Sequence, residues 1–235
     1  MKIILGDSND NLFLERDNKT LPLYDLADSR IKGHEYVEIG GIKWATMNVG
    51  ATGVTDGGMF FAWGETDGFL PSQVTGSSVD KQFSWADYKF SINGGSSNFK
   101  KYKTADAYRT LVPGDDPVTA NWGGAWRLPT HEESVALGDA VTTEWVTDYQ
   151  GSGVNGLLLT DKSDSTKQLF FPAAGCGFDG SVSRVGSYGY YWSSSLYESN
   201  PAYGWGLVFL GDYVNWESYS YRRYGLCARG VLGSE

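Results

Sequence analysis

Residues 188–224 read YGYYWSSSLYESNPAYGWGLVFLGDYVNWESYSYRRY, and they carry nine of the fifteen tyrosines and three of the nine tryptophans. These aromatic residues are dispersed among Gly, Ser and Asn. Tyr and Trp give large amphipathic contact area at low rotamer cost, while Ser, Gly and Asn supply adaptable hydrogen bonds. A segment that only fills a core would be richer in Leu, Ile and Val. The stretch therefore predicts a binding surface, although some members, such as Trp192 and Phe209, are expected in the core.

Short strands are predicted around this stretch. From Gly156 onward the pattern is β, and the apolar runs 157–159 and 168–171 bracket a polar hairpin loop at 161–167. Upstream, two apolar runs flank Gly40-Gly41, which is a β-hairpin signal. Residues 59–64 form an apolar run expected to be buried. Residues 70–104 are polar and predict a long surface loop.

Two short helices are predicted between these strands. Asp116 can cap a helix whose first residue is Pro117. Thr130-His-Glu-Glu133 is a capping box that opens a second helix, which Gly138 is expected to weaken or end. The fold class is therefore α+β, with short antiparallel strands, two short helices and long loops. Residues 1–32 predict an N-terminal strand, hairpin or docking arm, and residues 33–235 the main domain.

Charge and hydropathy exclude several classes of partner. The net charge of −9 and the pI near 4.7 argue against nucleic acid, because phosphate binding needs a basic face. No stretch approaches the roughly 20 apolar residues of a membrane helix. The apolar start at residues 3–5 is interrupted by Gly6-Asp7, so no Sec signal peptide is expected.

The chain has few residues that could carry catalysis or bind a metal or cofactor. Residues 175–180 match G-x-G-x-x-G, but no helical sequence follows, so a turn is expected and no nucleotide cofactor. The two histidines and two cysteines lack zinc-ligand spacing, and residues 161–164 lack the glycine of a calcium loop. No nucleophile elbow or acid–base pair is present. Cys176 and Cys227 are expected to be either a disulfide pair or two small apolar thiols.

Several phrases that occur in order resemble one family. They are Ile42-Lys-Trp-Ala-Thr-Met-Asn-Val-Gly50, Phe61-Ala-Trp-Gly-Glu65, Trp122-Gly-Gly-Ala-Trp-Arg-Leu-Pro-Thr130, Phe170-Phe-Pro-Ala-Ala-Gly175, Gly189-Tyr-Tyr-Trp-Ser-Ser-Ser195 and Arg222-Arg-Tyr-Gly-Leu-Cys-Ala-Arg-Gly-Val231. Residues 33–232 thereby resemble the fibrobacter major paralogous domain family, which shares the C-type lectin-like fold of formylglycine-generating enzymes. Ala228 and Gly230 depart from that pattern, but they lie in the terminal strand and do not change the expected fold. The reactive cysteine pair of those enzymes is not recognisable here, so no oxidase activity carries over.

Within that superfamily the chain looks most like the variable proteins of diversity-generating retroelements, in which adenines of a template are miscopied into the gene. The resemblance implies a lectin-like scaffold that displays a variable segment, here about 176–226, to a ligand. A randomised AAC codon can yield Tyr, Ser, Asp, Gly, Leu, Arg, Cys or Phe, but not Trp, Glu, Lys, Gln or Met. Trp192, Arg222, Gly225 and Arg229 match framework phrases and are expected to be scaffold.

These observations predict a set of ligand-binding residues. Most are reachable from such codons; Trp205 and Glu217 are not, and Asn215 is the residue that an AAC codon itself encodes. The set is Tyr188, Tyr190, Leu196, Tyr197, Trp205, Leu210, Tyr213, Asn215, Glu217, Tyr219, Tyr221, Arg223 and Tyr224.

The function expected from the sequence is a non-enzymatic receptor-binding protein, either on a phage tail or as an adhesin on a bacterial cell surface. Its partner would be a protein or glycan on a target cell. Residues 1–32 are expected to attach it to a larger assembly or to other copies. Two alternatives stay open: a fixed carbohydrate-binding or structural module of the same family, and a formylglycine-generating-like enzyme.

Overall fold

The computed structural model describes residues 34–75 and 79–232 with their side chains, and the backbone of four short strands before residue 34. Backbone contacts divide the chain into two units, Met1–Tyr36 and Val37–Glu235. The division falls shortly after Gly33, where the main domain was expected to start. In the first unit, three antiparallel strands form a sheet of order β1-β2-β3, comprising β1 (Lys2–Ile4), β2 (Phe13–Arg16) and β3 (Lys19–Pro22). The docking role expected of residues 1–32 rests largely on residues outside those described.

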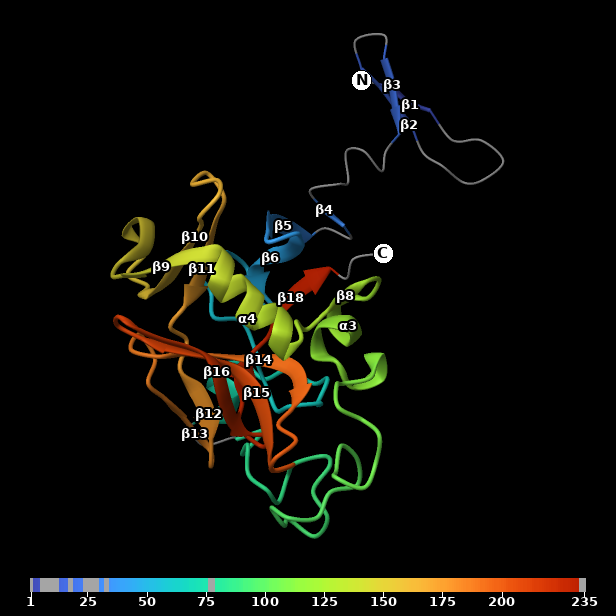
Figure 1. The fold of residues 1–235 in the computed structure, drawn as a ribbon, viewed down its shortest axis with the longest axis vertical. Coiled ribbons are helices and arrows are strands. Elements are labelled where there is room, and N and C mark those ends of the chain that lie inside the picture. Colours follow the sequence, from blue (N-terminus) through green and yellow to red (C-terminus); the bar gives the residue numbers. More distant parts are fainter. Residues whose placement is uncertain are drawn as a thin grey trace. The chain divides into compact units, whose positions relative to one another are not determined.

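The second unit is built from antiparallel strands with few helices, so the predicted α+β class is confirmed. Its largest sheet has the order β16-β15-β14-β17-β7, drawn mainly in orange and red in Figure 1. The strands are β7 (Phe60–Phe61), β14 (Gly189–Leu196), β15 (Tyr203–Leu210), β16 (Tyr213–Tyr221) and β17 (Leu226–Cys227). Within it, only the β14–β17 pairing is parallel among the described strands.

Three smaller groups of strands complete this unit. The first has the order β5-β6-β18-β8, with β4 (Arg30–Ile31) paired to the first residues of β5. Its members are β5 (His34–Ile39), β6 (Ile42–Asn48), β8 (Trp126–Arg127) and β18 (Arg229–Leu232). The second has the order β11-β10-β9 and contains β9 (Val141–Val146), β10 (Gly156–Asp161) and β11 (Gln168–Pro172). The third is a hairpin of β12 (Cys176–Phe178) and β13 (Ser181–Ser183).

Both predicted helices are confirmed together with their caps. The Asp116 carboxylate accepts bonds from the backbone N–H groups of Val118 and Thr119 at the start of α3 (Pro117–Trp122). The capping box of Thr130 and Glu133 opens α4 (His131–Ala140). A third helix, α2 (Pro71–Val74), was not predicted. Two short 3-10 turns, η1 (Pro113–Asp115) and η2 (Tyr149–Gly151), accompany these helices.

The sequence predicts that Gly138 weakens or ends the second helix, and the ending is wrong because α4 continues to Ala140. Packing explains why a glycine stands at this position. A Cβ atom at Gly138 would lie 2.7 Å from the Trp216 indole. The absent side chain therefore lets α4 pack against β14, β15 and β16 (Figure 1).

Both glycine turns behave as expected. Gly40 and Gly41 join β5 to β6 with positive φ angles, as a tight hairpin turn requires. The G-x-G-x-x-G stretch is also a hairpin, because Asp179 and Gly180 turn β12 into β13. No helix follows to hold a pyrophosphate, so the turn interpretation is confirmed.

The prediction of a surface loop at residues 70–104 is wrong in one respect. Apart from α2, the described part of this segment (70–75 and 79–104) contains no helix or strand, but several of its aromatic residues are buried. The Ser, Gly and Asn residues between them make the average composition polar, so the buried aromatic residues are not apparent from the sequence. The segment therefore contributes to the core of the second unit, where its rings meet Trp63 and Arg222. The buried aromatic members are Phe83, Tyr88, Phe90, Phe99 and Tyr102.

Candidate ligand-binding face

The register of the β15–β16 hairpin decides which tyrosines share a face. Between two paired positions β15 advances from Gly206 to Val208, while β16 spans the longer interval from Ser218 to Asn215. The extra residue therefore lies in β16, as in a β-bulge. Side chains alternate without interruption along β15 and shift by one within β16.

This shift places the aromatic residues at the base of the hairpin on the face that also carries the core. Trp205 lies on the same face of β15 as the buried residues Leu207 and Phe209. Its partner across the ladder is Tyr219, and Tyr203 pairs with Tyr221. The α4 helix covers only part of this face. It begins at His131, whose ring stacks on Trp205 with centroids 4.0 Å apart, and the base of the hairpin extends beyond this end of the helix.

Six residues form what we call the aromatic face: Tyr197, Tyr203, Trp205, Tyr219, Tyr221 and Tyr224. Tyr197 stacks on Tyr219 with ring centroids 4.3 Å apart, and Tyr203 stacks on Tyr221 at 4.4 Å. The two stacks meet edge to face, since the Tyr203 and Tyr219 rings lie at 85°. Offset and edge-to-face pairs are each worth about 0.5–1.5 kcal/mol beyond their buried area. The rings therefore hold one another in place without a ligand.

The aromatic face stays accessible to solvent. Tyr219 is 48% exposed, and the other five members are partly exposed. Two effects raise the pKa of Tyr203 to about 12: the larger is a hydrogen bond to Tyr221, and the second is burial. This phenol is therefore neutral at physiological pH and can donate and accept hydrogen bonds. The face combines apolar area with uncharged polar groups.

Arg223 closes one end of the aromatic face. Its guanidinium lies 4.8 Å from the Tyr224 ring and makes two bonds to the Asp179 carboxylate, at 2.6 and 3.1 Å. Tyr224 in turn contacts Phe178 in β12. The charge of Arg223 is thus largely matched by Asp179, which anchors the end of the face to the β12–β13 hairpin.

The structure does not bring the remaining predicted residues into this face. Leu210, Tyr213 and Asn215 occupy the opposite face at the turn of the hairpin. Tyr188 stacks with Tyr190, and both rings lie beside the Arg184 guanidinium. Glu217 is exposed at the bulge in β16.

Two predicted residues have no surface to offer a ligand. Leu196 and Tyr190 are buried, and Arg184 also bonds the Tyr190 hydroxyl. Buried and exposed rings both have aromatic residues as neighbours in this stretch, so the local sequence does not distinguish between them. Three contributors were missed instead: Tyr203, His131 and Trp85, the last of which meets Tyr221 edge to face. Tyr203 belongs to the same Tyr-rich stretch, but His131 and Trp85 join only through tertiary contacts.

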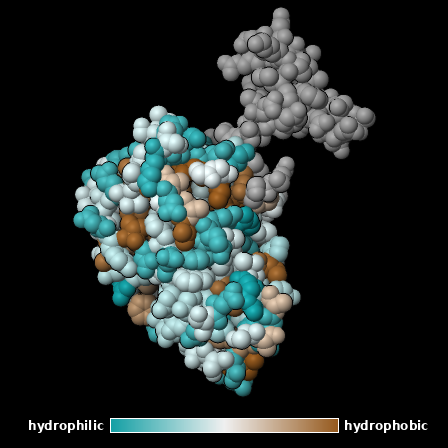
Figure 2. Space-filling model, in the orientation of Figure 1, coloured by the Kyte–Doolittle hydropathy of each residue, from teal (hydrophilic) through white to brown (hydrophobic). Residues whose placement is uncertain are grey.

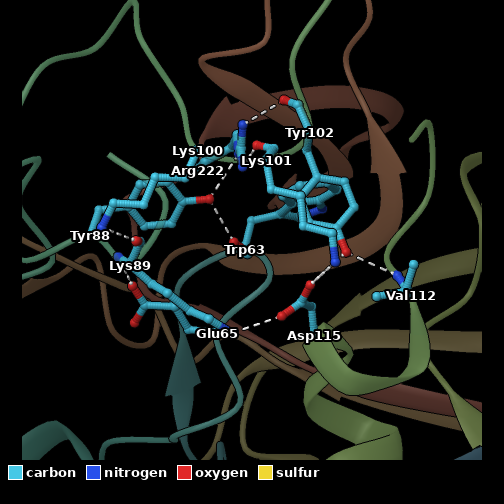
Figure 3. Close-up of polar contacts among 10 residues, drawn as sticks. All are labelled: Trp63, Glu65, Tyr88, Lys89, Lys100, Lys101, Tyr102, Val112, Asp115 and Arg222. Atoms are coloured by element: carbon cyan, nitrogen blue, oxygen red, sulfur yellow. Dashed lines mark hydrogen bonds and ion pairs between the residues drawn. The ribbon is translucent and has the colours of Figure 1, made fainter. Parts of the chain in front are cut away.

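A buried arginine, Arg222, lies next in sequence to the aromatic face, and Figure 3 shows it beside Tyr88 and Tyr102. Arg222 is fully buried next to Tyr221, and Nε donates to the Tyr88 hydroxyl at 2.8 Å. Its other nitrogens donate to the carbonyls of Lys101, Tyr102 and Pro201. Burial, the largest effect, lowers the pKa of Arg222 from its ordinary value. Nothing acidic bonds this cation among the described residues; aromatic rings and carbonyl dipoles surround it.

A second cluster in Figure 3 fixes the same loop through Asp115. Its carboxylate accepts from Lys89 at 2.7 Å, from Lys101 at 2.6 Å and from the Tyr102 hydroxyl at 2.8 Å. Burial raises the pKa of Asp115, but the bonds from Lys101, Lys89 and Tyr102 outweigh it, and the net shift is downward. The charged carboxylate therefore ties residues 89–102 to η1.

The cysteines lie in the core as free thiols, so the disulfide alternative is wrong. Burial raises the pKa of Cys176 to about 11 and that of Cys227 to about 12. Within residues 34–75 and 79–232, no three His, Cys, Asp or Glu side chains group closely enough to hold a metal ion. In the 161–167 loop, Asp161 and Asp164 accept bonds from Ser163 and Thr166, as acids in tight turns do.

Comparison with known proteins adds no relative. No protein-family model, no curated protein and no solved structure matches this chain. Among the described residues, no helix is both long and apolar enough to span a bilayer. On the face that Figure 2 displays, apolar residues occur in small groups among hydrophilic ones.

Proposed function

We propose that the chain is a non-enzymatic binding protein that contacts a receptor through its aromatic face. One observation carries the proposal: six Tyr and Trp side chains from β15, β16 and their flanking loops gather on one partly exposed surface and stack on one another. Interface hot spots are enriched in Tyr, Trp and Arg. Rings already held in the free protein lose little conformational entropy on binding.

The scaffold proposed for this face is a C-type lectin-like domain of the kind that diversity-generating retroelements vary. Three residues expected to be framework, Trp192, Arg222 and Arg229, are all buried. All predicted variable positions except Tyr190 and Leu196 are at least partly exposed. This division between buried framework and exposed variable positions supports the proposal. A phage tail tip or a bacterial cell surface, with a protein or glycan receptor on a target cell, is the setting that fits it.

The binding role can be tested with paired substitutions on the two faces of one hairpin. We expect Tyr219→Ser with Tyr221→Ser to weaken binding about 30-fold, since two hot-spot rings at an interface contribute about 2 kcal/mol or more. The matched control is Leu210→Ser with Tyr213→Ser on the opposite face. The measurement is titration of fluorescent protein onto a panel of bacterial cells, followed by glycan and surface-protein arrays.

Unchanged binding by the first pair, in a protein that unfolds at the same temperature as the original, would contradict the role of the aromatic face. A loss confined to the control pair would move the site to the turn of the hairpin. Both pairs are on strands whose inner residues stay intact, so unfolding is not expected.

Diversification makes a separate prediction about the gene. We expect a near-copy of codons 176–226 close by, differing only where the copy has adenine, beside a reverse-transcriptase gene. Sequencing the flanking DNA measures this directly. Differences should fall on exposed positions such as Tyr219 and spare codons for buried framework such as Trp192. No such repeat in the genome would instead indicate a fixed binding module.

A further inference from the structure

A cavity of about 370 Å³ lies outside the aromatic face, where several loops and the start of α2 converge. Small-molecule sites are typically concave, mostly apolar and about 300–1,000 Å³ in volume. None of its lining residues belongs to the aromatic face. They come from segments 55–58, 70–71, 153–155, 172–174 and 185–186, together with Phe60.

Aliphatic side chains form most of the cavity wall and its rim. Val185 is 63% exposed and Leu70 is 41% exposed, so both present apolar area to solvent here. Pro71, Val154 and Ala173 continue the apolar lining. Exposed aliphatic area concentrated around a concavity marks a binding site more often than scattered single residues do.

Hydrogen bonds hold the walls in place, so the cavity is preformed. On one side Gly186 N donates to Ala173 O at 2.7 Å, Ala173 N to Asn155 O at 2.9 Å, and the Asn155 side chain to Gly186 O at 3.0 Å. On the other side the backbones of Phe60 and Phe69 exchange two bonds. Three separate chain segments are thereby locked together, and an entering ligand need not order them.

Asp56 is the one ionisable group among the described residues that line the cavity. Its Oδ2 accepts from Thr52 N and Oγ1, and its Oδ1 accepts from Gly58 N at 3.0 Å. Burial raises the pKa of Asp56, but the bonds from Gly58 and Thr52 outweigh it and lower the pKa overall. A carboxylate oxygen can accept more than one bond, so the Asp56 carboxylate retains capacity for a further donor.

We propose that this cavity is a second binding site, which takes a small molecule with an apolar body and one amino group. The apolar body would lie against Val154, Ala173 and Val185, and the ammonium would reach the Asp56 carboxylate. A carboxylate-bearing ligand of the same shape would be repelled by Asp56. The site is independent of the receptor-binding role proposed for the aromatic face.

The test uses three probes with one apolar body: phenethylamine, phenethyl alcohol and 3-phenylpropionate. Each is titrated into the ¹⁵N-labelled full chain and followed by amide chemical shifts. We expect saturable shifts at Gly58, Ala174 and Gly186, with the amine bound about tenfold more tightly than the alcohol and the carboxylate most weakly. Absence of saturable shifts with all three probes, or equal affinity for them, would overturn the proposal.

Two variants separate charge from shape. Asp56→Asn should bring the affinity for the amine down to that for the alcohol, while the alcohol binds as before. Asp212→Asn removes the same charge from the exposed β15–β16 turn and should change neither affinity. A loss of amine preference in Asp212→Asn, or its retention in Asp56→Asn, would show that net charge rather than Asp56 selects the probe.

Discussion

Replacing Arg222 by Met should destabilise the protein by about 3–5 kcal/mol. The change leaves four acceptors without their donor: the Tyr88 hydroxyl and the Tyr102 carbonyl, which are buried, and the carbonyls of Lys101 and Pro201, which are partly buried. Each unsatisfied buried acceptor costs about 1–3 kcal/mol, reduced where neighbours relax. The guanidinium also lies 4.6 Å from the Phe99 ring and 4.8 Å from the Trp63 ring, and those contacts are lost too.

Urea unfolding measures the change, and two further variants make it diagnostic. Arg222→Lys keeps the charge but not the planar fork, so it should recover only part of the loss. Arg109→Met is the matched control: Arg109 also bonds two carbonyls and the Glu198 carboxylate, but its side chain is 41% exposed. We expect less than about 1 kcal/mol there. Equal losses for Arg222→Met and Arg109→Met would contradict the account.

This loss is a large fraction of the total, because a domain of this kind has only about 5–15 kcal/mol of net stability. The substitution should also disturb the proposed binding surface. Arg222 follows Tyr221 directly, and its partner Tyr88 contacts Trp85, which in turn packs on Tyr221. Loosening this core would therefore release one ring stack of the aromatic face.

Features set by neighbouring residues could be predicted from the sequence. The caps at Asp116 and Thr130 depend on a side chain reaching a backbone group two or three positions away. The Gly40-Gly41 turn needs only positive φ at two adjacent residues. Each of these is a local geometric requirement, so the residue type alone indicates the structure.

Features set by distant residues could not be predicted from the sequence. Gly138 lies within its helix, and the reason for a glycine there is that Trp216, far along the chain, occupies the space a side chain would need. The division of the tyrosines between two faces follows from one extra residue in β16, which alternation in the sequence does not reveal. The buried anchors of residues 70–104 are recognisable only once Arg222 is seen among them.

The candidate site shows the same contrast. Composition places the binding residues within the stretch 188–224, and most members of the aromatic face were predicted. Composition does not decide burial, so Leu196 and Tyr190 were included although both are buried. It also omits His131, whose role depends on α4 beginning beside Trp205.

The buried ion pair of Lys81 and Glu65 leads to the second large effect. Their charged atoms are 2.6 Å apart, and each side chain is only 8% exposed. Lys81 also donates to the Asp87 carbonyl, and Glu65 accepts from Lys89 N, so each charged group makes a further bond besides the ion pair. Lys81→Met should cost about 3–5 kcal/mol, because it leaves a carboxylate buried without its cation.

The double variant Lys81→Met with Glu65→Gln separates pairing from packing. The amide oxygen of the glutamine introduced by Glu65→Gln can still accept from Lys89 N, and no charge remains buried. We therefore expect the double variant to recover at least half of the stability that Lys81→Met loses. Because Glu65→Gln alone also destabilises, by leaving the Lys81 ammonium without its anion, the coupling energy in a double-mutant cycle should be at least about 2 kcal/mol. Urea unfolding of the four proteins measures it. Additive losses would mean that the two charges act independently, and the loop at 79–89 would then owe its position to its aromatic anchors alone.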